Sequence, residues 1–100
     1  MAKKQLKYVM CRTHAMGVFA GELESNVKGV VVLRNARRIW YWAGAASLSQ
    51  LATDGTSKPG ECKFPCAVDR VELMSPNGFE ILDITSKAKE SILSVPVWSK

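Results

Sequence analysis

The sequence predicts an α+β fold: a small, strongly bent, barrel-like antiparallel sheet with two short helices. Stretches that alternate apolar and polar residues are separated by turns containing glycine or asparagine. Two short helical stretches each follow a residue that can cap a helix. A chain of 100 residues suits one hydrophobic core, so we expect a single domain over residues 1–100.

The first part of the chain is expected to form three strands. Residues 7–12 are rich in strand-forming side chains, and 13–17 indicate a turn that ends in glycine. Alternation within 17–25 is typical of a half-buried strand. A turn at 25–29 leads into the β-branched run 30–33, so the strands on either side should pair as a hairpin.

Residues 37–42 (RRIWYW) resume this run after an interruption at Asn35 and Ala36. Strict alternation along an extended chain places successive side chains on opposite faces. One face would hold Arg37, Ile39 and Tyr41, and the other Arg38, Trp40 and Trp42. Each face would therefore combine an arginine with an aromatic ring.

Two helices are predicted from their caps. Ser47 is placed to cap a short helix over 48–53, which the Asp-Gly pair at 54–55 would end. Thr85 is placed to cap a terminal helix over 86–93.

The second half also contains strand patterns. Lys63 and Phe64 suggest a short strand, and residues 68–74 alternate apolar with charged side chains. The SPNG sequence at 75–78 is a strong turn signal, so 79–84 should return beside 68–74 as a second hairpin. The order of the strands is left open.

Positive charge is concentrated in the first half. Residues 1–50 carry eight Lys/Arg and two Glu, a net charge of +6, whereas 51–100 carry six Lys/Arg and seven Asp/Glu, a net charge of −1. This imbalance favours an anionic partner such as a nucleotide or nucleic acid, and a solvated basic face is the alternative. No apolar run approaches the roughly 20 residues of a membrane span. Three cysteines, an odd number, suit a reducing cytoplasm better than a disulfide framework.

Catalysis and metal binding have little support. His14 is the single histidine, and no two carboxylates lie close enough in sequence to suggest an acid–base pair. Cys11, His14, Cys62 and Cys66 are zinc-type ligands with imperfect spacing, and burial as a small hydrophobe is the alternative for Cys11. We therefore expect no enzyme, no metal and no cofactor.

The arginine and aromatic residues of 34–52 form the predicted ligand surface. A guanidinium group suits a phosphate and a flat ring suits a purine. Stacking contributes about 1–3 kcal/mol per base, and a hydrogen bond to a charged group about 1.5–3 kcal/mol. Polar groups at the helix start could bind a phosphate, and Lys58 and Lys63 could close over an anion. The predicted site residues are Arg37, Arg38, Trp40, Tyr41, Ser47, Ser49, Gln50 and Lys58.

The alternatives assign these side chains to the fold. The Trp rings would be core, the arginine stems would cover them, and Ser47 would be only a cap. The lysines would then only solubilise the loop.

Several strings also resemble a known family. They are GVFAGELES, NARRIWYW, GAASLSQLA, KPGECKF and KAKESILSVPVWS, and they extend over nearly the whole chain. They resemble small proteins of unknown function carried mainly by tailed bacteriophages. The sequence also resembles the phage sponge proteins that defeat CBASS immunity by sequestering cyclic dinucleotides, cyclic GMP-AMP in particular.

This resemblance implies a homo-oligomer in the host cytoplasm that binds a cyclic nucleotide signal without cleaving it. It assigns no residue roles, so the predicted site residues rest on the chemistry above. Two alternatives remain open: a basic nucleic-acid-binding phage accessory protein, and an inhibitor of a host protein.

Overall fold

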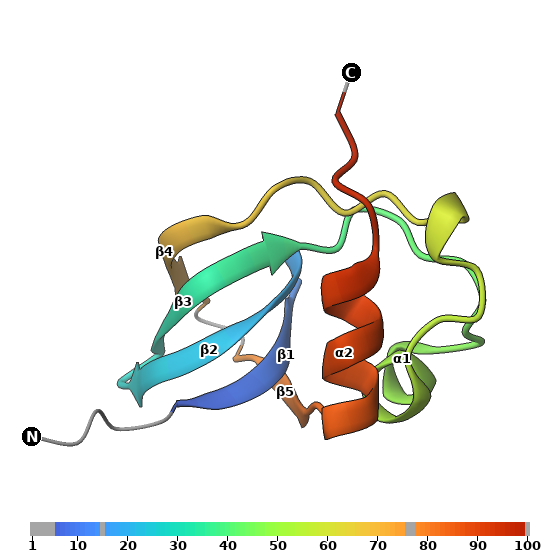
Figure 1. The fold of residues 1–100 in the computed structure, drawn as a ribbon. Coiled ribbons are helices and arrows are strands. Elements are labelled where there is room, and N and C mark those ends of the chain that lie inside the picture. Colours follow the sequence, from blue (N-terminus) through green and yellow to red (C-terminus); the bar gives the residue numbers. More distant parts are fainter. Residues whose placement is uncertain (1–5, 15, 76–77, 100) are drawn as a thin grey trace, which may run out of the picture.

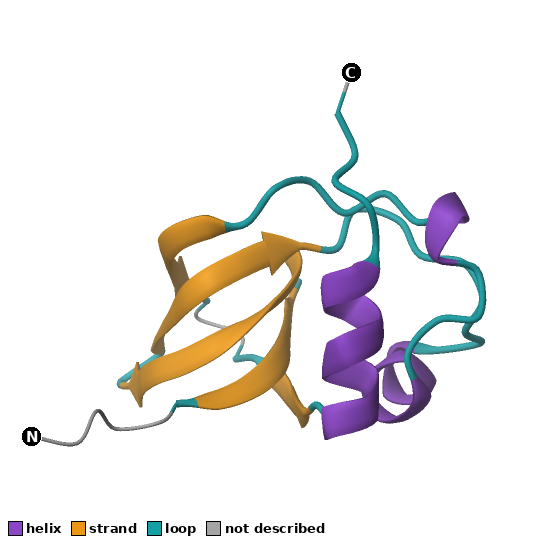
Figure 2. Cartoon of the chain, viewed as in Figure 1, coloured by secondary structure: helices purple, strands orange, loops and turns teal. Residues whose placement is uncertain are grey.

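The computed structural model describes residues 6–14, 16–75 and 78–99, and it consists of a curled five-stranded sheet with helices against one face (Figures 1 and 2). The predicted α+β class is confirmed. The sheet curls but does not close, so only its curvature is barrel-like. The elements in chain order are β1 (Lys7–Thr13), β2 (Gly17–Val27), β3 (Val30–Arg38), α1 (Leu48–Asp54), the 3-10 turn η1 (Pro59–Glu61), β4 (Val68–Met74), β5 (Glu80–Asp83) and α2 (Ser86–Ser94).

The strand order is β4-β3-β2-β1-β5, and every pair is antiparallel. The predicted pairing of 17–25 with the strand after it is confirmed. The predicted hairpin of 68–74 with 79–84 is wrong, because β4 pairs with β3 and β5 pairs with β1 at the opposite edge. These long-range pairings place Leu73 opposite Val31 and Ile81 opposite Cys11, which adds apolar side chains to both ends of the inner core. The turn predicted between them includes residues 76–77, which lie outside the described residues.

The interruption predicted at Asn35 and Ala36 is a β-bulge within a continuous strand. These two residues of β3 lie opposite Gly21 alone on β2, and Asn35 has a φ of 49°. A Cβ on Gly21 would lie only 3.0 Å from the Cα of Ala36, so glycine permits the close approach. A bulge shifts the side-chain alternation beyond it. As a result Arg37 faces the helices.

The sheet is buried on both faces. Tyr8 and Met10 of β1 point into the core beneath the helices, whereas Val9 and Cys11 point into the core inside the curl. The core beneath the helices is completed mainly by Ala20, Ile39, Leu48, Leu51, Ala52, Cys62, Phe64, Ile92 and Val95. The inner core is completed by Phe19, Val31, Leu33, Ala36 and Leu73.

Both helices begin where their caps predicted. Ser47 Oγ accepts a 3.1 Å hydrogen bond from Gln50 N at the start of α1. Thr85 Oγ1 accepts a 3.1 Å bond from Ala88 N and also donates a 2.6 Å bond to the carbonyl of Thr53. Thr85 therefore caps α2 and joins it to α1.

Two long loops, residues 39–46 and 56–64, lie side by side beyond the sheet, and we call them the loop layer (Figure 1). Gly44 allows their close contact, because its φ is +81° and a Cβ there would lie 2.6 Å from Lys58 N. Lys63 N donates a 2.7 Å bond to Tyr41 O. Phe64 in turn pairs with Val97 of the C-terminal tail. Three extended segments, at 40–42, 63–64 and 97–98, are thereby joined.

Candidate functional site

Arg37 is enclosed in the fold. Arg37 is only 5% exposed, and its guanidinium donates hydrogen bonds to four backbone carbonyls. The acceptors are Pro65 at 2.9 Å, Ile92 at 3.0 Å, Phe64 at 3.0 Å and Val95 at 2.7 Å. Four of the five N–H donors of an arginine are thus engaged. Desolvation by burial lowers the pKa of Arg37, yet an arginine starts so far above neutrality that it stays charged.

This geometry corrects the expectation that Arg37 faces a ligand. The four carbonyls include those of Ile92 and Val95 at the C-terminal end of α2, where the helix dipole favours a cation. Arg37 therefore fastens α2 and the loop layer to the sheet.

Arg38 lies on the opposite side and is exposed. Its guanidinium carbon is 4.3 Å from the centre of the Phe19 ring, and its Nη1 donates a 2.8 Å bond to Met16 O. Arg38 takes part in none of the ion pairs found among the described residues. Its charge is therefore available to an anion.

Trp40 and Tyr41 are exposed, by 64% and 52%. Trp42, which alternation would place with Trp40, packs instead against the core beneath the helices. The strand alternation ends because β3 stops at Arg38; beyond it, Tyr41 pairs with Lys63 through an isolated bridge.

Lys63 lies between two aromatic rings. Its Nζ is 5.8 Å from the centre of the Tyr41 ring and 5.6 Å from that of Trp98. Within the described part of the chain, no carboxylate forms an ion pair with Lys63. We call Trp40, Tyr41, Lys63 and Trp98 the aromatic–lysine surface. It offers flat rings and an unneutralised cation on adjoining segments.

The predicted residues of α1 engage their own helix. Ser47 caps it, and the side-chain oxygen of Gln50 accepts a 2.7 Å bond from Ala46 N. Ser49 is exposed, and no side-chain hydrogen bond from it is found in the described chain. Lys58 is exposed in the loop layer. The structure shows no contact that joins these four residues to Trp40 or Tyr41.

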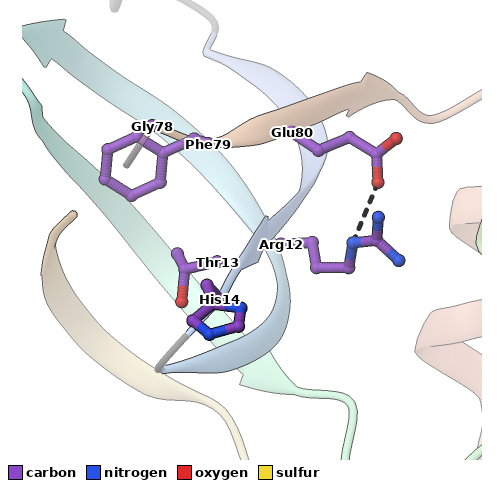
Figure 3. A pocket seen from close by; sticks show the side chains of 6 residues that line it. All are labelled: Arg12, Thr13, His14, Gly78, Phe79 and Glu80. Atoms are coloured by element: carbon purple, nitrogen blue, oxygen red, sulfur yellow. Dashed lines mark ion pairs between the residues drawn. The ribbon is translucent and has the colours of Figure 1, made fainter. Parts of the chain in front are cut away.

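A separate hollow of about 500 Å³ lies between the end of β1 and the start of β5 (Figure 3). It is lined by Arg12, Thr13, His14, Gly78, Phe79 and Glu80. Arg12 Nε and Glu80 Oε1 form a 3.1 Å ion pair on one side, which neutralises the arginine. Figure 3 shows the Glu80 carboxylate turned toward Arg12 and the His14 ring next to Thr13. The hollow therefore offers neither a free cation nor an acid–base pair.

The cysteines lie apart. Cys11 is buried in the inner core and Cys62 in the core beneath the helices, so the sheet separates them. Cys66 is exposed. Over residues 6–14, 16–75 and 78–99, no three potential metal ligands are grouped.

Two residues of the aromatic–lysine surface, Lys63 and Trp98, lie outside the predicted site set. They meet Tyr41 only through the bridges Tyr41–Lys63 and Phe64–Val97, which join distant parts of the chain. The sequence shows the apolar and basic residues of KPGECKF and PVWS, but it does not reveal the backbone pairing that brings these two segments together.

Comparison with known proteins yields one family. A family model described as "Domain of unknown function (DUF6948)" matches residues 6–92, which include the whole sheet and α1. No curated protein and no solved structure matches the chain. In the described part of the chain, no helix is both long and apolar enough to cross a membrane.

Proposed function

This chain belongs to the DUF6948 family, and from the surface it carries we propose that it sequesters a cyclic nucleotide, such as cyclic GMP-AMP, without cleaving it. The observation that carries the proposal is the position of Lys63, whose ammonium lies near the rings of both Tyr41 and Trp98 and takes part in no ion pair among the described residues. The exposed Trp40 precedes Tyr41 in the chain.

A nucleotide phosphate competes well with the rings for Lys63. A cation–π contact at an exposed site contributes about 0.5–1 kcal/mol, whereas a hydrogen bond between charged groups contributes about 1.5–3 kcal/mol. The ammonium therefore gains by turning to a phosphate. The rings it leaves are then free to stack on bases, at about 1–3 kcal/mol per base.

The chemistry of the surface suits capture. A protein that withholds a signal needs affinity for the intact ligand and no stabilisation of a transition state. The aromatic rings and the lysine ammonium of the aromatic–lysine surface supply that affinity. The resemblance to phage sponge proteins that act against CBASS supports the same function, and with it a phage protein in the host cytoplasm.

A cyclic dinucleotide has two bases and two phosphodiester groups. A two-fold homo-oligomer presents each surface twice, which matches the pseudosymmetry of such a ligand. We therefore include a homo-oligomer in the proposal.

Isothermal titration calorimetry with a panel of cyclic di- and trinucleotides tests this function. We expect dissociation constants below about 1 μM for at least one ligand, which corresponds to roughly −8 kcal/mol. The absence of binding to every ligand at micromolar concentrations overturns the proposal. Chromatography of the ligand after denaturation separates capture from hydrolysis: intact ligand supports a sponge, and cleaved ligand contradicts it.

Salt dependence distinguishes a nucleotide site from a nucleic-acid surface. Binding to single-stranded oligonucleotides through many phosphates weakens steeply with salt, because each contact releases counterions. The affinity for a ligand with only two charges falls much less as the salt concentration rises. Tight, steeply salt-dependent binding of oligonucleotides without binding of cyclic nucleotides would replace the proposed function with nucleic-acid binding.

A further inference from the structure

β4 is a long edge strand with apolar side chains in solvent. It pairs with β3 on one side only and ends the sheet. Val68 is 48% and Met74 58% exposed. An uncovered edge of this kind is a template for pairing with another chain, and proteins usually protect it. We propose that β4 pairs antiparallel with β4 of a second copy of this chain, which makes one continuous sheet across a two-fold axis.

The outward face of β4 is complementary to itself. It presents, in order, Val68, Arg70, Glu72 and Met74. With the two-fold axis at Val71, Arg70 lies opposite the partner's Glu72, and Val68 lies opposite the partner's Met74. Both exposed apolar residues are then covered, and two cross-strand ion pairs form. Cross-strand pairs of these kinds stabilise a sheet.

The charges also select the register. A two-residue slip in one direction places Arg70 opposite the partner's Arg70, and a slip in the other direction places Glu72 opposite the partner's Glu72. Like charges directly opposite one another are destabilising. A one-residue slip exchanges the two faces of the strand. Only the register centred on Val71 joins opposite charges and apolar residues together.

On the inward face of β4, the same register places Val71 at the two-fold axis and the exposed Asp69 opposite the partner's Leu73. Leu73 is buried in the inner core, and Val71 packs against that core while remaining half-buried. In the dimer Val71 lies opposite the partner's Val71, which removes more of its surface from water. Within one copy, Arg70 Nη1 and Glu72 Oε2 form a 3.1 Å ion pair between exposed side chains, and the proposed cross-strand pairs compete with this contact.

The charges permit an exchange experiment. Arg70→Glu gives a strand with two glutamates on this face, and Glu72→Arg gives one with two arginines. In either homodimer every cross-strand ion pair becomes a like-charge pair, so we expect the dissociation constant to rise about 10-fold or more. A mixture of the two variants restores both ion pairs and should form a one-to-one heterodimer. The double variant R70E/E72R should dimerise like the wild type.

Sedimentation velocity and light scattering measure these states. Lys87→Glu is the matched control for Arg70→Glu, since it makes the same charge change and breaks another exposed ion pair, with Asp54, away from β4. Circular dichroism confirms that each variant is folded. The wild type, the double variant, the K87E control and the one-to-one mixture should be dimers, and the two single variants alone should be monomers.

Three results overturn the inference. The first is a wild type that stays monomeric up to ~1 mM, which would leave less than about 4 kcal/mol of association energy. The second is a dimer whose dissociation constant is unchanged in each single variant. The third is a pair of single variants that do not associate when they are mixed. A monomeric wild type would also remove the homo-oligomer from the proposed function. Capture of a cyclic nucleotide at the Trp40 and Lys63 surface is measured separately by calorimetry, so it can succeed or fail independently of the pairing of β4.

Discussion

Arg37 Nη1 donates a 3.0 Å hydrogen bond to the carbonyl of Ile92, which joins the end of β3 to the last turn of α2. The β-bulge at Asn35 and Ala36 is what turns Arg37 toward the helix. An arginine at the centre of a strongly basic segment therefore serves the fold.

Replacement of Arg37 should be severely destabilising. Arg37→Ala removes a donor from four buried or half-buried carbonyls. Those of Phe64 and Ile92 keep the backbone bonds from Trp98 N and Val95 N, whereas those of Pro65 and Val95 lose the donor found for them in the described chain. Each unsatisfied buried acceptor costs about 1–3 kcal/mol. Arg37→Lys should retain part of the stability, because an ammonium has three donors and no planar fork. Urea unfolding followed by circular dichroism measures the difference. Arg38→Ala, which removes a single exposed hydrogen bond, is the control, and an equal loss in the two alanine variants would contradict the assignment.

Stability should fall at alkaline pH. Burial raises the pKa of Tyr8 from 10.0 to about 12, and burial raises the pKa of Cys11 from 9.0 to about 11. Because the folded state holds each proton more tightly, this stability is complete below pH ~9 and is lost as pH rises through about 11 to 12. Each shift of two units corresponds to about 2–3 kcal/mol. Urea unfolding between pH 8 and 12 measures the loss.

Tyr8→Phe isolates one of the two groups. The Tyr8 hydroxyl is buried without a hydrogen-bond partner in the described structure, so its removal should leave the free energy of unfolding unchanged or raise it slightly at pH 8. The variant should also lose the part of the alkaline transition that lies between pH ~10 and 12. An unaltered transition in Tyr8→Phe would show that Tyr8 does not contribute to it.

The two helix caps should differ in strength. Ser47→Ala removes one capping bond, at about 1 kcal/mol. Thr85→Ala removes a cap and also the 2.6 Å bond to Thr53 O, so its cost should be about 2 kcal/mol. Thr85→Ser keeps the hydroxyl and is the control. Thermal unfolding would refute this account if Ser47→Ala proved the more damaging of the two alanine changes.

Ligand binding should depend on Trp40 and Lys63. Trp40→Ala removes a stacking ring, worth about 1–3 kcal/mol per base, and should weaken cyclic nucleotide binding by roughly 5- to 150-fold. Lys63→Gln should weaken it by roughly 10- to 100-fold through loss of a charged hydrogen bond. Calorimetry should show little change for Lys87→Gln, an exposed lysine on α2. Lys58→Gln decides between two positions in the loop layer: a larger effect at Lys58 than at Lys63 would move the site.

Local signals in the sequence were sufficient for most elements of the fold. The caps Ser47 and Thr85 act within one helical turn, and the alternation toward the end of β4 reflects its inward face, where Leu73 is buried. β1 gave a weaker pattern because four successive residues of it are buried between two cores. Such a strand loses the alternation that identifies a sheet with one solvated face.

Long-range pairing accounts for what the sequence did not reveal. The turn signal at 75–78 is local, but the partners of β4 and β5 are strands distant in the chain, whose free edges they occupy. The direction of Arg37 depends on a bulge and on carbonyls from two separate segments, residues 64–65 and the end of α2. Likewise, the rings around Lys63 come from the segment after β3 and from the C-terminal tail. Neither contact has a periodic signature.

The pairing of Val9 with Asp83 closes a loop of about three quarters of the chain. Closing so large a loop costs more entropy than closing the short turns of the β1–β2–β3 meander, and contacts distant in sequence slow folding. We therefore expect the meander to assemble early and both flanking strands to dock late. During that interval a nascent chain exposes two unpaired edges, and the alternating charges of β4 would then guide its encounter with another newly made copy.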